Sequence, residues 1–506
     1  MDQNIQKLTK SNDQYEEYER LPILLKRFSF KEKMHIAHVY SSQGIMFNRN
    51  IKKNKSMVLP WCVETFVMLS MEATEYGSGD FKGKNANKAI KMLNAIWSAT
   101  SEALKRSCGR FEFMDVFLPV TLLTQFKCQE IDEVLKYRYW YILDHNFKQI
   151  SLKDIFESKM GASYEEYLMF GEILEVIFLA RADNRNVTIP REVLEYIFVQ
   201  RFPLIANKMT ISRENYVKLQ HDYIKNRIDP YSYVYSLCPS VRYPLIEVGD
   251  NIYFPLPHLL MRSVTDSMMY RITENDDSIR RKIGKHVLEQ YLYDIVRDSN
   301  VYDEVSPEVK YKKSREDALS PDVIARQGKD VLFLDSKSTV PSVGIRVMEA
   351  ADFEKNIDII GKNIEKLVRR IREFDLYNPF KENVSKNQKD YWGIVVVQED
   401  SFIRRQFYYE KARIYLGVEE DSEDWRWIIE HIKVASLYEV EKIALSCRSL
   451  IDACKQCFQE DPYAYPFLGF TEDEFILRNK RAVEFTNEHN KKVDKVINEI
   501  KQLLDV

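Results

Sequence analysis

The chain has 506 residues, of which 45% are hydrophobic and 30% are charged. This composition excludes an intrinsically disordered protein, and at roughly 100–200 residues per domain the length predicts about three domains. The 74 basic and 77 acidic residues give a net charge of −3, which excludes a protein that coats nucleic acid over its whole surface but allows a local basic groove.

The composition also favours helices and an intracellular location. Glycine is scarce, at 15 residues, and only 16 prolines occur, so few residues interrupt helices. No apolar run reaches about 18 residues, and the first residues lack the pattern of a secretory signal. The seven cysteines are odd in number and thinly spread, as in proteins of a reducing compartment. We therefore expect a cytoplasmic protein with no membrane contact.

The first 240 residues are expected to form a mostly helical domain. Between positions 61 and 73, apolar residues gather on one broad stripe, directly after a proline suited to a first helical turn. Similar patterns predict helices at residues 61–73, 87–106, 113–126, 164–182, 191–202 and 212–227. The segment 77–85 is predicted to be a loop.

Strand patterns begin near Pro239, where two β-rich runs flank Gly249 and Asp250 and predict a hairpin. Further strands are predicted at residues 305–313, 321–326, 331–338, 392–398 and 432–443, with a turn at 327–330, a loop at 378–390, and long helices at 279–297 and 348–374. We therefore expect a mixed α/β domain at residues 241–445, followed by a helical extension at 446–506.

The chemically informative residues lie in this α/β domain. Side chains alternate along a strand, so Asp335 and Lys337 share one face. The tight turn at Gly328 places Asp322 near Asp335 on the neighbouring strand. Glu289 borders the apolar stripe of the preceding helix and is the candidate for a third carboxylate beside the two aspartates. Glu308, on the flanking strand, is the competing candidate. Carboxylates converging with a lysine suit Mg²⁺, whereas an exposed Asp335–Lys337 ion pair, worth about 0–1 kcal/mol, is the structural alternative.

The pair Pro321-Asp322, followed by Asp335-Ser336-Lys337, resembles the PD-(D/E)XK nuclease superfamily over roughly residues 280–440. The resemblance implies a restriction-endonuclease-like core that binds Mg²⁺, with Mn²⁺ as a substitute. It implies that Asp322, Asp335 and the main-chain carbonyl of Ser336 bind the metal and that Glu289 contributes to the metal shell. Lys337 would act on the attacking water and offset charge on the phosphate.

The function implied is a Mg²⁺-dependent endonuclease acting on nucleic acid, with DNA favoured, and by fold-level analogy one of bacterial antiphage defence or restriction. The alternative is a catalytically silent subunit of the same fold that binds nucleic acid or scaffolds a partner. A third hypothesis is a structural helical protein in which Glu289 and Asp322 lie far apart. Because cleavage of both strands of a nucleic-acid duplex usually needs two active sites, we expect a homo-oligomer or a complex with a partner protein.

Basic residues near this site are candidate phosphate contacts, with a solvated surface as the alternative. They lie before the acidic helix, before Asp322 and on the long helix after the motif. The candidates are Lys285, Lys312, Lys313, Lys362, Lys366, Arg369 and Arg370. Helical spacing predicts that residues 362, 366, 369 and 370 share one face.

Other chemistries have weaker support. Cys454 and Cys457, with Cys447 before them, lack a fourth zinc ligand nearby and are expected to be helical thiols. His35 and His38 lack a glutamate at metalloprotease spacing, and His286 is expected to be structural. Neither glycine-rich phosphate-loop pattern occurs, so no nucleotide cofactor is expected.

Overall fold

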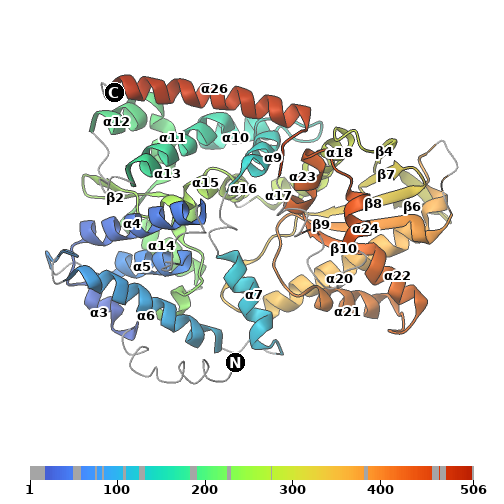
Figure 1. The fold of residues 1–506 in the computed structure, drawn as a ribbon, viewed down its shortest axis with the longest axis horizontal. Coiled ribbons are helices and arrows are strands. Elements are labelled where there is room, and N and C mark those ends of the chain that lie inside the picture. The colour runs from blue at the N-terminus through green and yellow to red at the C-terminus, as the bar shows by residue number, and fades with distance from the viewer. Residues whose placement is uncertain are drawn as a thin grey trace.

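The computed structural model describes a mixed α/β protein, as predicted, in which helices dominate. The described residues are 18–49, 59–73, 77–82, 85–105, 110–124, 131–182, 191–224, 230–274, 276–380, 384, 386–457, 467 and 475–503. Figure 1 shows a helical part on the left and a sheet-containing part on the right, with α7 between them. No helix within the described ranges combines the length and apolar character needed to span a bilayer.

The N-terminal part is helical as expected. Its helices are α3 (Leu21–Leu25), α4 (Phe30–Arg49), α5 (Pro60–Glu72), α6 (Ala86–Lys105), α7 (Phe113–Leu123), α9 (Glu133–Leu143), α10 (Leu152–Met160), α11 (Tyr164–Ala182), α12 (Arg191–Glu195), a π-helix (Tyr196–Arg201), α13 (Pro203–Met209), α14 (Arg213–Tyr223), α15 (Leu260–Ser263) and α16 (Asp266–Thr273). In α5 every residue from Pro60 to Met71 is buried, because α3, α4, α6 and α14 surround it. Parts of the expected segments 77–85, 87–106, 113–126, 212–227 and 378–390 lie outside the described residues.

The predicted hairpin at Gly249 is confirmed, with strands β2 (Leu245–Val248) and β3 (Asn251–Tyr253). Gly249 has a φ of 58°, the left-handed conformation that glycine adopts without strain. Strand β2 also pairs in parallel with β1 (Thr210–Ser212). This small sheet is separate from the one that carries the predicted site residues.

The main sheet has five strands in the order β10-β9-β8-β7-β4. Its strands are β4 (Glu304–Pro307), β7 (Val323–Gln327), β8 (Asp330–Lys337), β9 (Tyr391–Val397) and β10 (Ile432–Ser436). Strands β7 and β8 are antiparallel and turn at Gly328, whose φ is 60°, whereas β8, β9 and β10 run parallel. The tight turn and the two strands that flank it are therefore confirmed.

Helices cover both faces of this sheet. Val331 and Phe333 of β8 pack in one hydrophobic cluster with α20 (Ala350–Arg372), whereas Leu332 and Leu334 pack in the other with α18 (Glu289–Arg297). Figure 1 shows α18 and α20 on opposite sides of the strands. The predicted alternation of β8 is therefore confirmed.

Two strand predictions were wrong in extent. Residues 305–313 form β4 and a second strand, β5 (Lys310–Lys313), which pairs with β6 (Glu316–Leu319) in a separate hairpin. Pro307 ends β4, since proline cannot donate to a continuing ladder. The strand predicted at 432–443 ends at Ser436, because the Ser436 side chain caps α23 (Leu437–Leu445) by accepting a hydrogen bond from the backbone N–H of Glu439.

The predicted helix 279–297 is confirmed, but it is not a regular α-helix. It consists of α17 (Asp277–Lys282), a π-helix (Ile283–Leu288) and α18 (Glu289–Arg297), which follow one another without a break. Turns of π-helix inside α-helices are rare and often occur at functional sites. Glu289 is the first residue after this π-helix.

The C-terminal helices return to both parts of the molecule. Helix α24 (Leu450–Cys457) packs on β8, whereas α26 (Lys480–Leu503) packs on α9, α11 and α12. The remaining α-helices of the described residues are α19 (Val343–Arg346), α21 (Arg405–Leu416) and α22 (Glu423–His431). The division of the chain at residues 240 and 445 stays a prediction.

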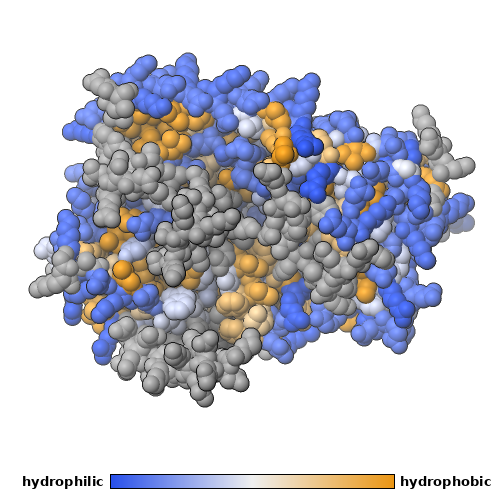
Figure 2. Space-filling view, viewed as in Figure 1, coloured by the Kyte–Doolittle hydropathy of each residue, from blue (hydrophilic) through white to orange (hydrophobic). Residues whose placement is uncertain are grey.

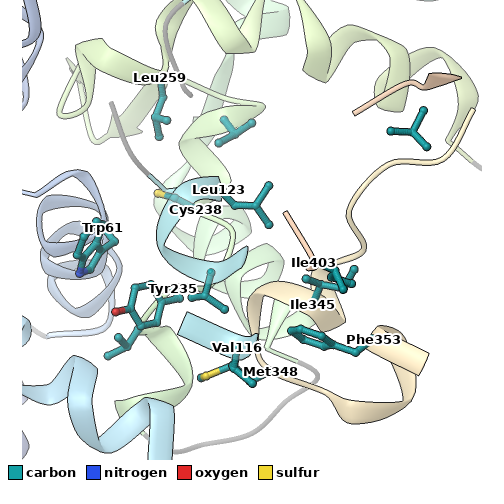
Figure 3. Packing of buried hydrophobic residues seen from close by; sticks show 14 of the residues in the cluster. Trp61, Val116, Leu123, Tyr235, Cys238, Leu259, Ile345, Met348, Phe353 and Ile403 are labelled. Atoms are coloured by element: carbon teal, nitrogen blue, oxygen red, sulfur yellow. The ribbon is translucent and has the colours of Figure 1, made fainter. Parts of the chain in front are cut away.

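Helix α7 contacts the segments that precede α20 and α21. Asp115 of α7 forms an ion pair with Arg404, at 2.9 Å, and the Leu123 carbonyl accepts a hydrogen bond from Arg346, at 3.3 Å. Figure 3 shows Val116 and Leu123 of α7 between Trp61 and Tyr235 on one side and Ile345 and Phe353 on the other. On the face in Figure 2, hydrophilic residues cover much of the described outer surface, and hydrophobic residues are visible between them towards the middle.

Candidate functional site

Asp322 and Asp335 lie opposite each other at one end of the β7–β8 pair. Val323 pairs with Leu334, so the next cross-strand position joins Asp322 to Asp335. Directly opposite residues of an antiparallel pair point to the same face, with Cβ atoms about 4.5–5.5 Å apart. Asp335 is fully buried and Asp322 is 6% exposed. The structure therefore brings these two predicted residues together.

Ser336, which lies between Asp335 and Lys337 on β8, orients the Asp322 side chain. Oδ2 of Asp322 accepts hydrogen bonds from the backbone N–H of Ser336, at 2.6 Å, and from the Ser336 hydroxyl, at 2.7 Å. Burial and the negative charge of Asp335 raise the pKa of Asp322 to about 6, although Lys337 and the Ser336 hydrogen bonds oppose the shift. One oxygen is thus held by the chain, and the carboxyl titrates close to neutral pH.

Two cations meet the carboxylate of Asp335. Nη1 of Arg370, on α20, donates a hydrogen bond to Oδ1 at 2.6 Å, and Nζ of Lys337 lies 2.7 Å from Oδ2. The Arg370 side chain is 9% exposed and that of Lys337 is 23% exposed. Of the two cations, Lys337 is therefore the one more accessible to solvent.

Glu289 belongs to the same electrostatic cluster. Burial and the negative charges of Asp322 and Glu308 raise its pKa to about 8, while the charges of Lys337 and Lys285 oppose the shift. Since an isolated glutamate has a pKa near 4.5, the Glu289 carboxyl holds a proton at neutral pH. Glu308, the competing candidate, thus acts on Glu289 as a neighbouring charge.

These donors suit a cation that takes few protein ligands. Within the described ranges, no three His, Cys, Asp or Glu side chains are arranged as a group that could hold a metal ion. Mg²⁺ does not need such a cage, because it keeps several waters and is usually bound by one or two carboxylates together with substrate phosphates. Oδ2 of Asp335 is buried and accepts no well-aligned hydrogen bond from the described residues, although the Lys337 ammonium lies 2.7 Å from it. A second acid opposite this atom, with a raised pKa, fits a site that a divalent cation would stabilise.

The predicted basic residues separate into two groups. Arg370 contacts Asp335, and burial lowers the pKa of Lys366, which lies near Asp335, Lys337 and Arg370. Lys285 lies near Glu289, and its charge acts on the Glu289 carboxyl. The other four each pair with a neighbouring carboxylate: Lys312 with Asp317, Lys313 with Glu373, Lys362 with Asp358, and Arg369 with Glu365. Residues 366 and 370 therefore face the site, while 362 and 369 lie beside other acids.

Sequence reasoning missed the direct contact between Arg370 and Asp335. Arg370 was expected among the phosphate contacts, but the structure places its guanidinium against the carboxylate. Arg370 follows Leu367 at the three-residue spacing of one helix face, and Leu367 is buried against the sheet. This spacing from the buried Leu367 is the sequence feature that could have predicted that Arg370 faces the sheet.

Three of the alternative metal ligands, Cys454, Cys457 and His38, are buried within the protein. Cys454 and Cys457 are buried thiols of α24, and burial raises the pKa of Cys454 to about 12. His38 is hydrogen-bonded to the carbonyl of Phe254 at 2.6 Å, and burial lowers its pKa to about 4. Each of these side chains is accounted for by packing.

Comparisons with protein-family models, curated proteins and solved structures find no match for this chain. The chemistry of the site therefore has to be inferred from its own side chains.

Proposed function

We propose that this protein is a Mg²⁺-dependent nuclease that hydrolyses phosphodiester bonds of nucleic acid, with DNA as the favoured substrate. The observation that carries the proposal is the cross-strand pair of Asp322 and Asp335, with the ammonium of Lys337 against Asp335. This arrangement agrees with what the resemblance to the PD-(D/E)XK superfamily implies for these positions. A role in bacterial antiphage defence or restriction rests on fold-level analogy.

In this proposal Asp322 and Asp335 hold the metal ion, with the main-chain carbonyl of Ser336 as a further ligand. Bound Mg²⁺ would supply a nucleophilic hydroxide and neutralise charge on the phosphate. Ser336 holds Oδ2 of Asp322 through its two hydrogen bonds, and this fixes the direction in which the other oxygen, Oδ1, points. Arg370 fixes the orientation of Asp335 from the covering helix.

Lys337 and Glu289 carry the remaining roles. The Lys337 ammonium is partly exposed beside the two acids, where it stabilises negative charge that develops on a phosphate. Glu289 holds a proton at neutral pH, and a cation nearby would lower its pKa and release that proton. Glu289 then adds negative charge to the metal shell only when the cation is present.

One observation favours the catalytically silent alternative. Arg370 and Lys337 meet both oxygens of Asp335, so a divalent cation has to compete with two side-chain cations. In a subunit that only binds nucleic acid, Arg370 and Lys337 would always neutralise Asp335, and no metal ion would replace them. The two functions differ in whether Mg²⁺ binds and whether phosphodiester bonds break.

The deciding experiment is a cleavage assay on plasmid, linear duplex, single-stranded DNA and RNA, with Mg²⁺, Mn²⁺ or a chelator. We expect Mg²⁺-dependent cleavage that Asp335→Asn and Lys337→Ala each reduce by about 100-fold or more. Asp330→Asn is the matched control, because Asp330 is also a buried acid of β8 but pairs with Lys455, at 2.6 Å.

Wild-type rates in the Asp335→Asn protein would contradict the proposed catalytic role. Tight nucleic-acid binding by the wild-type protein, without cleavage in any metal, would instead support the silent subunit.

A further inference from the structure

The positive side chains around the proposed site differ in whether an acid already neutralises them. Lys312, Lys313, Lys362 and Arg369 each form an ion pair with a nearby carboxylate. Such pairs are already compensated locally, so binding a phosphate would require breaking or sharing them. Their contribution to binding nucleic acid is reduced accordingly.

A second set of cations lies on the helix that leads to Glu289. Arg280, Arg281 and Lys282 form the last turn of α17, and Lys285 lies in the π-helix. All four side chains are exposed. None of them forms an ion pair with another described residue, and Asp276, one turn earlier, already accepts hydrogen bonds that cap the helix. We call these four residues the α17 cations.

The α17 cations continue towards the carboxylate cluster. Arg281 and Lys285 are four residues apart, and Lys285 is four residues before Glu289, a spacing that keeps side chains on neighbouring parts of one helix surface. The charge of Lys285 acts on the Glu289 carboxyl, which shows that the two are close.

The same helix touches the strand that carries Lys337. A Cβ atom on Gly284 would lie 2.8 Å from Oγ of Ser338, the residue directly after β8. The π-helix is therefore in contact with the end of the catalytic strand in the proposed mechanism. A nucleic-acid backbone that reaches Lys337 would pass over or beside this contact.

We propose that the α17 cations bind the phosphate backbone of the nucleic-acid strand that reaches Asp322 and Asp335, and that the ion-paired Lys312 and Lys313 of the β5–β6 hairpin do not. This inference rests on the proposed function, because it assumes a nucleic-acid substrate. It assigns the substrate path to the Glu289 side of the sheet. Charge complementarity carries it: exposed cations that form no ion pair with a described residue lie along the helix that leads to the site.

The test compares two triple substitutions that remove the same charge. The first is Arg281→Gln/Lys282→Gln/Lys285→Gln, and the matched control is Lys312→Gln/Lys313→Gln/Lys362→Gln. Both are made in the full chain carrying Asp335→Asn, so that binding is measured without cleavage. The dissociation constants of labelled duplex and single-stranded oligonucleotides are measured between 50 and 200 mM KCl, with Ca²⁺ present.

We expect the first triple to weaken duplex binding by roughly tenfold or more at low salt and to reduce the slope of log K against log[salt] by about 2–3, since each phosphate contact contributes about 0.9. The control should change both quantities much less. A Lys282→Gln/Lys285→Gln protein, with two exposed charges removed, should give an intermediate slope and guards against misfolding of the triple. Equal effects of the two triples, or a larger effect of the control, would overturn the inference.

This outcome is separate from that of the cleavage assay. If the wild-type protein cuts nucleic acid and the α17 triple keeps its salt slope, the substrate path is wrong and the nuclease function stands. If the wild-type protein neither cuts nor binds nucleic acid, both proposals fail.

Discussion

Arg370 and Asp335, 35 residues apart in the chain, form a buried hydrogen-bonded ion pair between a helix and the central strand, with Nη1 and Oδ1 2.6 Å apart. Lys337 meets the other oxygen of the same carboxylate. The most buried acid of the proposed site is thus held by α20 as well as by its own strand. This relationship makes α20 part of the site, and its consequences can be measured.

Removing the guanidinium should destabilise the fold. Arg370→Met leaves Asp335 buried with only Lys337 as a counter-charge, and we expect the free energy of unfolding to fall by about 3 kcal/mol. Arg369→Met is the matched control, because the Arg369 side chain is 57% exposed and pairs with Glu365 at the surface, so its loss should cost about 0.5 kcal/mol. Urea unfolding measures both variants, and equal midpoints would contradict a structural role for the Arg370–Asp335 pair.

The raised pKa of Glu289 should make the folded protein less stable at alkaline pH, where this carboxyl loses its proton. Its pKa is about 8 in the folded protein and near 4.5 when unperturbed, so between these values the folded state binds more protons than the unfolded state. The contribution to stability is therefore complete below about pH 4.5 and is lost as the pH rises to about 8. We expect Glu289→Gln to be more stable than wild type at pH 9 and to show a flatter pH dependence. Urea unfolding at pH 5, 7 and 9 checks this, and parallel curves for the two proteins would contradict it.

Metal binding should release protons near neutral pH. If Mg²⁺ binds beside Asp322 and Glu289, whose pKa values are about 6 and about 8, its affinity should rise between pH 6 and 8 as these groups lose their protons. Calorimetric titration in two buffers of different ionisation enthalpy measures the number of protons released. Glu289→Gln should release fewer protons at pH 7, and binding without any proton release would contradict this arrangement of acids.

The contact between Gly284 and Ser338 should be sensitive to one methyl group. A Cβ atom at position 284 would lie 2.8 Å from Oγ and 3.2 Å from Cβ of Ser338, so Gly284→Ala has to displace the residue that follows Lys337. We expect cleavage to slow by about tenfold, since displacements near 1 Å at a site cost up to roughly 100-fold. Ser338→Gly in the same protein removes the obstructing atoms and should restore much of the rate. A Gly284→Ala protein that cleaves as fast as wild type would show that this contact does not position Lys337.

The relation of Asp322, Asp335 and Lys337 could be predicted because it depends on local geometry. A strand has a period of two, and a tight turn at Gly328 fixes which residues of β7 and β8 are opposite. The same reasoning correctly separated Leu332 and Leu334 from the face of Asp335. Sequence patterns also predicted α5, α11 and α20 to within about two residues, because their apolar residues recur at helical spacing.

The partners of α20 could not be predicted in the same way. Residues 362, 366, 369 and 370 looked like one basic face, but which of them reaches Asp335 depends on how the whole helix packs on the sheet. Asp358 and Glu365, on the same helix, pair with Lys362 and Arg369. The division of residues 305–313 into two strands likewise depends on tertiary pairing, since β4 joins β7 while β5 joins β6.

The π-helix at Ile283–Leu288 sets the rotational phase between the cations before it and the acid after it. A π-helical turn takes up one residue more than an α-helical turn, and an α-helix advances about 100° per residue, so regular α-helical bonding over the same residues would rotate Arg281 and Lys282 by about that angle relative to Glu289. The apolar stripe of α18 would meanwhile stay packed on the sheet. The orientation of these cations relative to Glu289 therefore depends on the irregular bonding of this segment.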